Sequence, residues 1–108
     1  MNKTVIIYRT RKEEEPVIEW LESLRDIIIR ERIESRVKRI INGNYGDHKR
    51  VQGILELRFH FGKGYRLYCG EDGNTIVVLL IGGDKSSQEK DIRTASECWE
   101  DYYEQKKV

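Results

Sequence analysis

The chain has 108 residues, of which 38% are hydrophobic and 36% charged, which suits one hydrophobic core and leaves no room for a second ordinary domain. Periodic apolar runs and a single proline argue against disorder. No run approaches the roughly 18 apolar residues of a membrane span, and the residues after Met1 lack the pattern of a secretory signal. We therefore expect one domain over residues 1–108, in the cytoplasm.

Charge is unevenly distributed, although the net charge is only +1. Residues 25–68 carry eleven basic and five acidic side chains, whereas residues 69–108 carry five basic and nine acidic ones. A locally basic middle can hold phosphates, but a nearly neutral chain gives little long-range attraction for RNA. Cys69 and Cys98 are too far apart in sequence for a metal or redox motif, so we expect packed free thiols.

The first half of the chain predicts one strand and a helical hairpin. Val5–Tyr8 is a short apolar run typical of a strand. Pro16 fits the first position of a helix, and Asp26 fits the N-cap of a second helix that ends before the turn at residues 42–47. We expect the basic residues of this second helix, Arg36 among them, to lie mostly off its apolar face. The predicted core faces are Val17, Trp20, Leu21 and Leu24 in the first helix, and Ile29, Ile33, Val37, Ile40 and Ile41 in the second.

From Val51 the apolar period changes to two, which predicts a strand over residues 51–61, with Val51, Leu55, Leu57, Phe59 and Phe61 on one face. A Gly62-Lys63-Gly64 loop would pair it with residues 65–69. This register places Phe61 opposite Tyr65, Phe59 opposite Leu67 and Leu57 opposite Cys69 on the apolar face, and His60 opposite Arg66 and Arg58 opposite Tyr68 on the polar face.

The last third predicts a central strand and a long helix. Residues 76–81 are apolar on both faces, as expected of a strand in the middle of a covered sheet. Ser86 and Glu89 fit a capping box for the helix that follows. Its predicted core face is Ile92, Ala95, Trp99 and either Tyr102 or Tyr103. The order β-α-α-β-β-β-α predicts an α+β fold in which helices pack on a small, mostly antiparallel sheet.

The strongest candidate site is the polar face of the predicted hairpin. Five side chains share it, namely Glu56, Arg58, His60, Arg66 and Tyr68. Two neighbouring arginines repel each other unless an anion lies between them. The alternative is an ordinary solvated face with weak ion pairs, and composition alone favours that alternative.

Two other segments carry weaker signals. Residues 82–88 place two glycines and Lys85 where a strand opens onto a helix N-terminus, and backbone N–H groups there can bind phosphate. An ordinary turn and cap is the alternative. Residues 47–50 bring basic groups in before the hairpin, with a solvated charge run as the alternative. The two histidines lack partners at metal-ligand spacing, and no nucleotide-binding glycine motif is present, so we expect no metal and no cofactor.

A set of segments, taken in order, resembles one family of proteins. These segments are Trp20-Leu21, Gly43-Asn44-Tyr45-Gly46-Asp47, Glu56-Leu57-Arg58, Gly64-Tyr65-Arg66-Leu67-Tyr68, Leu79-Leu80-Ile81-Gly82-Gly83-Asp84-Lys85, and Gln88 with Asp91-Ile92. The chain resembles the phage-derived, HigB-like branch of the RelE/ParE toxins, often called addiction module killer proteins. The likeness runs from about Val5 to Tyr102 and implies the RelE-like fold.

The resemblance implies the toxin of a type II toxin-antitoxin system that acts as a ribosome-dependent mRNA endonuclease, an mRNA interferase that needs no metal. Its implied partners are mRNA on the ribosome and a helix-turn-helix antitoxin, through which alone it would meet operon DNA. In the reaction a ribose 2′-hydroxyl attacks the adjacent phosphate. The site therefore needs a proton acceptor, a proton donor and fixed cations.

The resemblance also assigns roles to residues. Arg58 and Arg66 would clamp the phosphate, Lys85 would supply a third cation, and Tyr68 would stack on a base or orient the sugar. The general base stays open among His60, Glu56 and Lys49. The RNA-binding candidates are Lys49, Arg50, Lys63 and Gln88. An aromatic residue or histidine near the C-terminus is often catalytic in this family, and Tyr102 and Tyr103 are the candidates here.

Two other functions stay open, because a shared fold does not decide function. One is a ParE-like toxin that inhibits DNA gyrase without catalysing a reaction. The other is an inactive relic that only binds its antitoxin. Arg58, Arg66 and Lys85 favour the nuclease, because a gyrase inhibitor has no need to surround a phosphate.

Overall fold

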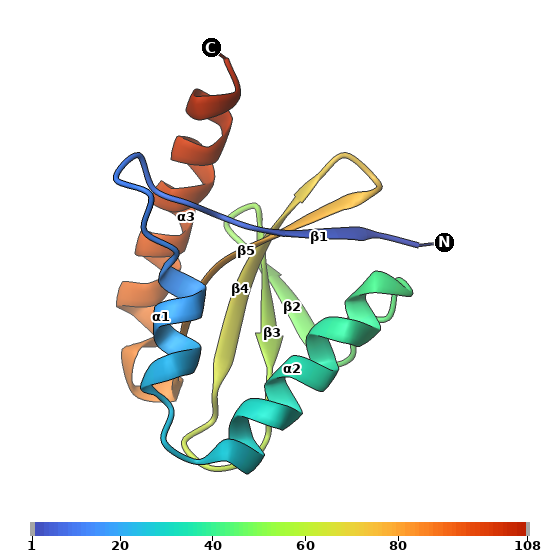
Figure 1. Ribbon diagram of the computed structural model, residues 1–108, viewed down its shortest axis with the longest axis vertical. Helices are drawn as coiled ribbons and strands as arrows, with labels where there is room; N and C mark the ends of the chain where they lie inside the picture. Colours follow the sequence, from blue (N-terminus) through green and yellow to red (C-terminus); the bar gives the residue numbers. More distant parts are fainter. Residues whose placement is uncertain (1, 108) are drawn as a thin grey trace.

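A computed structural model describes residues 2–107, which form five β-strands, a short 3₁₀ turn and three α-helices (Figure 1). In chain order these are β1 (Thr4–Ile7), α1 (Pro16–Ser23), α2 (Ile27–Ile41), β2 (His48–Val51), β3 (Ile54–Arg58), β4 (Arg66–Asp72), β5 (Ile76–Gly83), the 3₁₀ turn (Lys85–Ser87) and α3 (Gln88–Lys106). The predicted α+β class is confirmed.

All five strands belong to one mixed sheet with the order β1-β5-β4-β3-β2. β1 runs parallel to β5, and every other pair is antiparallel. The sheet is thus mostly antiparallel, as the sequence predicts. Residues 77–81 of β5 are all buried, which confirms that this strand is covered on both faces.

The helices cover both faces of the sheet and give three layers (Figure 1). α1 and α2 pack on one face around a core cluster that includes Val17, Ile33 and Leu57. α3 packs on the other face around a second cluster that includes Tyr68, Val78 and Ala95. Trp20 belongs to the first cluster and Trp99 to the second, so both tryptophans are packing residues, as predicted. Within residues 2–107 no helix combines the length and the apolar character needed to cross a bilayer.

Two of the predicted helix starts are confirmed and one is wrong. Pro16 opens α1, and the Asp26 carboxylate accepts a hydrogen bond from the N–H of Ile28 at 2.9 Å at the start of α2. The predicted Ser86-Glu89 capping box is not formed. Asp84 is the cap instead, because its Oδ1 accepts the Ser86 N–H at 2.8 Å and so nucleates a 3₁₀ turn ahead of α3.

The structure contains a hairpin that the sequence does not predict. The alternating run that begins at Val51 is interrupted by Gln52 and Gly53, which form a two-residue turn between β2 and β3. Both have positive φ, 48° and 81°, as the tight turns of right-twisted hairpins require. Consequently Val51 packs in the α3 cluster, and Leu55, predicted to share its face, packs under α1 and α2.

The pairing of β3 with β4 differs from the predicted register by two residues. Leu57 lies opposite Leu67 and Arg58 opposite Arg66, so the predicted pairs, such as His60 with Arg66 and Arg58 with Tyr68, are wrong. The connection is longer than three residues and is closed by hydrogen bonds from Phe59 to Tyr65 and from Gly64 to Phe61. Because side chains alternate with a period of two, a shift of two residues leaves each one on its predicted face.

Most of the predicted core faces are confirmed at the level of single residues. Tyr102, rather than Tyr103, packs in the α3 cluster. Ile41 is exposed, although the sequence places it on the buried stripe of α2. Cys69 and Cys98 are both free, and Cys69 is fully buried.

Candidate functional site

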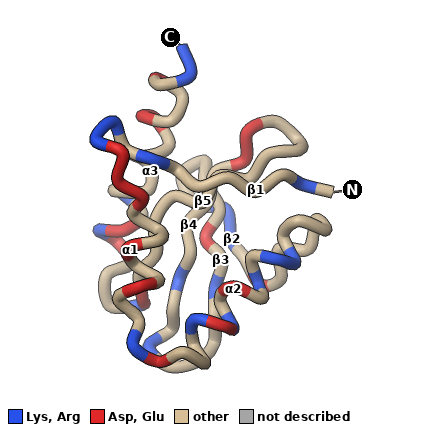
Figure 2. Tube along the Cα trace, in the orientation of Figure 1, with Lys and Arg blue, Asp and Glu red and all other residues tan. Residues whose placement is uncertain are grey.

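An open hollow of about 690 Å³ lies where the β3–β4 loop meets the start of α3. Its lining includes the following cationic or titratable side chains: Arg58, His60, Lys63, Arg66 and Lys85. No Asp or Glu within residues 2–107 lines it. Figure 2 shows basic residues on β3, on β4 and on the loop between them, whereas the region of α1 is rich in acidic residues. We call this feature the basic hollow.

Two arginines face each other at the base of the hollow. Arg58 is the direct cross-strand partner of Arg66, which brings their backbones to the roughly 5 Å separation of paired strands. Arg66 is buried, and its Nη1 donates to the carbonyl oxygens of Gly64 at 2.8 Å and Tyr65 at 3.2 Å. The Nε atoms of both arginines are buried without a hydrogen-bond partner. The donors free to meet an anion are the two Nη groups of Arg58 and Nη2 of Arg66, because none of them is buried or forms a hydrogen bond with another described residue.

Glu56 lies beneath these arginines and is fully buried. Its Oε2 accepts hydrogen bonds from the Tyr68 hydroxyl at 3.2 Å and from Gln88 Nε2 at 2.8 Å. Its Oε1 lies 3.5 Å from Arg58 Nε, in an ionic contact without hydrogen-bond geometry. Glu56 partly neutralises Arg58 and holds it from below, and its burial keeps it from touching a bound substrate.

The predicted alternative of a solvated face is wrong for Glu56 and Tyr68, because α3 covers both. The stacking role predicted for Tyr68 is also wrong, since its ring has no exposed surface on which a base can lie. Burial, with the nearby Glu56 carboxylate, raises the pKa of the Tyr68 phenol far above its usual value. Gln88 lines the hollow, but its amide is committed to Glu56.

Lys85 reaches the hollow from the connection between β5 and α3. Its backbone N–H donates to the Lys63 carbonyl at 3.3 Å, which ties this connection to the β3–β4 loop. Its side chain is exposed. A β-carbon added at Gly64 would lie 3.3 Å from Lys85 Cβ and 3.5 Å from Arg66 Nη1, so Lys85 and Arg66 approach Gly64 together.

The predicted phosphate site on backbone N–H groups of this connection is not formed. The Ser86 N–H donates to the Asp84 side chain and the Ser87 N–H to the Asp84 carbonyl, so the cap uses these donors itself. Hydrogen bonding by Ser86 lowers the pKa of Asp84, which keeps the capping carboxylate charged. Anion binding in the hollow therefore depends on side chains.

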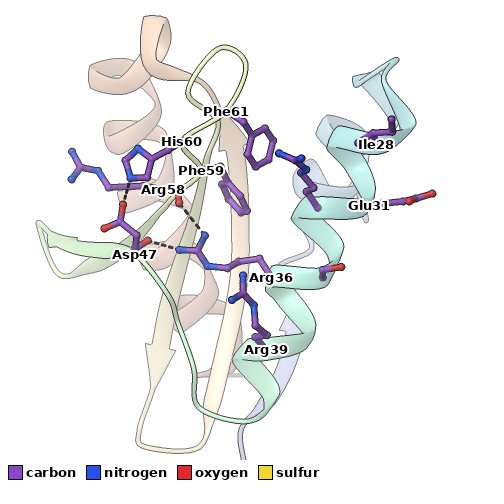
Figure 3. A pocket seen from close by; sticks show the side chains of 11 residues that line it. Ile28, Glu31, Arg36, Arg39, Asp47, Arg58, Phe59, His60 and Phe61 are labelled. Atoms are coloured by element: carbon purple, nitrogen blue, oxygen red, sulfur yellow. Dashed lines mark hydrogen bonds and ion pairs between the residues drawn. The ribbon is translucent and has the colours of Figure 1, made fainter.

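His60 lies at the rim of the hollow and is exposed. Its Nε2 contacts the Asp47 carboxylate, as Figure 3 shows. This hydrogen bond lowers the pKa of Asp47, so the carboxylate stays ionised beside the ring. A carboxylate on one ring nitrogen orients the imidazole and leaves Nδ1 available to take up a proton.

Arg36 is a structural residue, although its charge led us to expect it off the core face of α2. It is buried, and its guanidinium donates to the backbone carbonyl of Tyr45 and, as Figure 3 shows, to those of Asp47 and Arg58. These bonds fasten the loop that carries Asp47 to the end of β3. The signal was available, because Arg36 lies three residues after Ile33 and four before Ile40, on their side of the helix.

Four other predicted site residues lie outside the hollow. Lys49 is exposed on the edge strand β2, opposite Glu56. Arg50 points to the other face and pairs with Glu71. Tyr102 and Tyr103 lie 14 or more residues after the start of α3, which is about 20 Å along the helix. Neither tyrosine therefore lies at the hollow. Among the described residues no group of His, Cys, Asp and Glu is arranged to hold a metal ion.

Comparisons with known proteins give one similar sequence. A Haemophilus influenzae protein, described as uncharacterized, is 47% identical over 77 residues, which are 70% of this chain and 78% of that protein. No family model matches the chain, and no solved structure matches it. At this identity and coverage, the chain belongs to the same family as the uncharacterized Haemophilus influenzae protein.

Proposed function

We propose that this protein is the toxin of a type II toxin-antitoxin system and cleaves mRNA as a RelE/HigB-like endonuclease. The observation that carries the proposal is the basic hollow. It gathers Arg58, Arg66 and Lys85 from three different segments around a space that no carboxylate of residues 2–107 lines. A cation cluster of this kind, with spare guanidinium donors, suits a phosphate that gains charge during reaction.

The proposed reaction joins the 2′ oxygen of one nucleotide to its 3′ phosphorus and breaks the bond from phosphorus to the 5′ oxygen of the next nucleotide. His60, oriented by Asp47, takes the proton from the 2′-hydroxyl. Arg58 and Arg66 bind the non-bridging oxygens. The departing 5′ oxygen receives a proton from Lys85, because arginine does not give up its proton at neutral pH. The products carry a 2′,3′-cyclic phosphate and a 5′-hydroxyl.

The order of elements also supports the RelE-like assignment. A strand, two helices, an antiparallel meander and a final helix follow one another, with β2 as an additional edge strand. Under this proposal the partners are mRNA on the ribosome and a helix-turn-helix antitoxin, and the protein works in the cytoplasm.

The test uses induced expression in bacteria, with Lys85→Ala as the site variant and Lys90→Ala as its matched control. Both lysines are exposed and lie near the start of α3, but only Lys85 lines the hollow. We expect wild type and Lys90→Ala to arrest growth and to cut messages. We expect Lys85→Ala to lower cleavage by about 10²–10³-fold, as the loss of one fixed transition-state contact does. Mapping of 5′ ends measures the cuts, which should carry 5′-hydroxyls.

Other outcomes would overturn the proposal. Growth arrest with intact messages and relaxed or broken DNA would indicate a ParE-like gyrase inhibitor. A folded wild-type protein that neither arrests growth nor cuts RNA, yet binds the product of a neighbouring gene, would indicate an inactive relic. Equal cleavage by Lys85→Ala and wild type would overturn the proposed reaction, in which Lys85 is the proton donor.

A further inference from the structure

A second groove, of about 520 Å³, runs between α2 and the loop that follows β3 (Figure 3). Its α2 wall presents side chains from successive turns of the helix, among them Ile28, Arg32, Arg36 and Arg39. Its other wall consists of Asp47 and the segment from Arg58 to Phe61. We call this feature the α2 groove.

The charge of the α2 groove is strongly positive. Four arginines and His60 line it, against two carboxylates, Glu31 and Asp47. Asp47 already contacts His60, and Arg36 is used by backbone carbonyls. Arg32 and Arg39 are exposed, and neither forms an ion pair or a side-chain hydrogen bond with another described residue. These two arginines are therefore available to bind a ligand in the α2 groove.

These two arginines are suitably placed for an extended polyanion. Arg32 and Arg39 are seven residues apart, so they lie on one side of the helix and roughly 10 Å apart along its axis. The Arg32 guanidinium lies 5.0 Å from the centre of the Phe61 ring. An arginine beside an aromatic ring is a surface on which a nucleic-acid base can stack.

The α2 groove adjoins the basic hollow. Four residues, the run from Arg58 to Phe61, line both features. A strand whose reacting phosphate lies at Arg58 and Arg66 can therefore pass over His60 and Phe61 and reach Arg32. An acidic peptide suits this groove less well, because Ile28 is the one aliphatic side chain among its described lining residues.

We propose that the α2 groove binds the single-stranded RNA segment that adjoins the cleaved phosphate, with Arg32 and Arg39 on its phosphates and Phe61 beneath a base. This inference rests on the proposed function, because it extends the same RNA beyond the reacting nucleotide. Its consequence is that affinity depends on RNA length, and that the α2 arginines contribute to binding without touching the reacting atoms.

The test measures binding of 2′-O-methyl oligouridylates, which cannot be cleaved by 2′-hydroxyl attack, to the purified full chain. A nonamer spans both features, whereas a trimer fills only the basic hollow. The variant is Arg32→Gln/Arg39→Gln. The matched control is Lys12→Gln/Lys38→Gln, which removes the same charge from two exposed lysines that line neither feature. Affinity is measured across a salt series, for the nonamer and the trimer alike.

We expect the arginine variant to bind the nonamer roughly tenfold more weakly and to lower the slope of log affinity against log salt by about 1.4, or about 0.7 for each lost phosphate contact. Trimer binding and both control measurements should stay at the wild-type values. Unchanged nonamer binding by the arginine variant would overturn the proposal that RNA binds in the α2 groove, and would leave the proposal for the basic hollow unaffected. Failure of the wild type to bind either oligonucleotide would overturn both this inference and the proposed function. Displacement of the nonamer by a polyglutamate peptide at lower concentration than by RNA would assign the groove to an acidic protein partner.

Discussion

The two faces of the β3–β4 pair are both covered by helices, yet they are built differently. The face under α1 and α2 consists of apolar side chains, among them Leu55, Leu57 and Leu67. The face under α3 carries Glu56 and Arg66, buried next to apolar neighbours. Burial of apolar groups stabilises a fold directly, whereas burial of charged groups costs desolvation that hydrogen bonds and ion pairs only partly offset. The face under α1 and α2 therefore stabilises the fold, whereas the face under α3 contributes less stability and positions the cations.

Leu57→Ala tests the apolar face and should have the largest effect on stability. Leu57 is fully buried, so its truncation leaves a cavity and should lower the free energy of unfolding by about 2–5 kcal/mol. Urea denaturation measures this loss. Ile41→Ala serves as control, because Ile41 is exposed, and it should change stability by less than about 1 kcal/mol. A loss of that smaller size for Leu57→Ala would contradict the role given to this face.

Two substitutions of Glu56 test the polar face. Glu56→Ala leaves the Tyr68 hydroxyl and the Gln88 amide without their acceptor, which should cost about 1–3 kcal/mol of stability. Glu56→Gln keeps an acceptor for both groups and should cost less. Both variants should also reduce RNA cleavage, because Arg58 loses the carboxylate that holds it. If Glu56→Ala destabilised the protein more than Leu57→Ala does, the ranking of the two faces would be reversed.

Tyr8→Phe tests whether polar contacts on the α3 side add stability, with the smallest expected effect. The Tyr8 hydroxyl donates to Asp101 at 2.6 Å, and this bond lowers the pKa of Asp101 below its ordinary value of 3.8. A lowered carboxylate pKa adds stability above the ordinary value, and this stability is lost as the pH falls through the folded-state pKa. Tyr8→Phe should therefore cost about 1–2 kcal/mol at pH 7 and progressively less below about pH 4.

The measurement for Tyr8→Phe is urea denaturation at several pH values. Tyr103→Phe is the control, because Tyr103 is exposed and donates no hydrogen bond to another residue within 2–107. A stability difference between wild type and Tyr8→Phe that stays constant from pH 7 to pH 3 would contradict the role of ionised Asp101.

Local sequence signals predict much of the fold. Pro16 and Asp26 begin helices because their chemistry suits the first turn, whatever the rest of the chain does. Residues 76–81 are apolar at every position, which leaves little choice but a covered strand. The faces of β3 and β4 are also predicted correctly, since alternation alone decides which side chains share a face.

Features that depend on turn geometry are not predicted. Gln52-Gly53 is a weaker turn signal than Asn-Gly, and the alternation around it continues, so β2 and β3 look like one strand. The length of the loop after β3 depends on Gly62 and Gly64, which both adopt positive φ. In the sequence these two glycines are equally consistent with a three-residue loop and with the longer loop of the structure. Both errors concern the positions at which the chain reverses its direction. Local hydrophobicity does not specify these positions.

The site is predicted in part. The sequence identifies Arg58, Arg66 and Lys85, and the structure brings them to one hollow. It does not predict that α3 buries Glu56 and Tyr68, because their burial depends on a helix that begins 20 or more residues later in the chain. Nor does it predict the contact of His60 with Asp47, which follows from the longer loop.

At the two glycines that end β5, side chains from the helices on both faces of the sheet pack directly against the strand backbone. A β-carbon at Gly82 would lie 2.0 Å from the Trp20 ring of α1, and one at Gly83 would lie 1.9 Å from the Asp91 carboxylate of α3. Side chains of α1 and α3 therefore contact opposite sides of β5 at its end, two residues before Lys85. A displacement of either helix would therefore also move the end of β5, and with it Lys85.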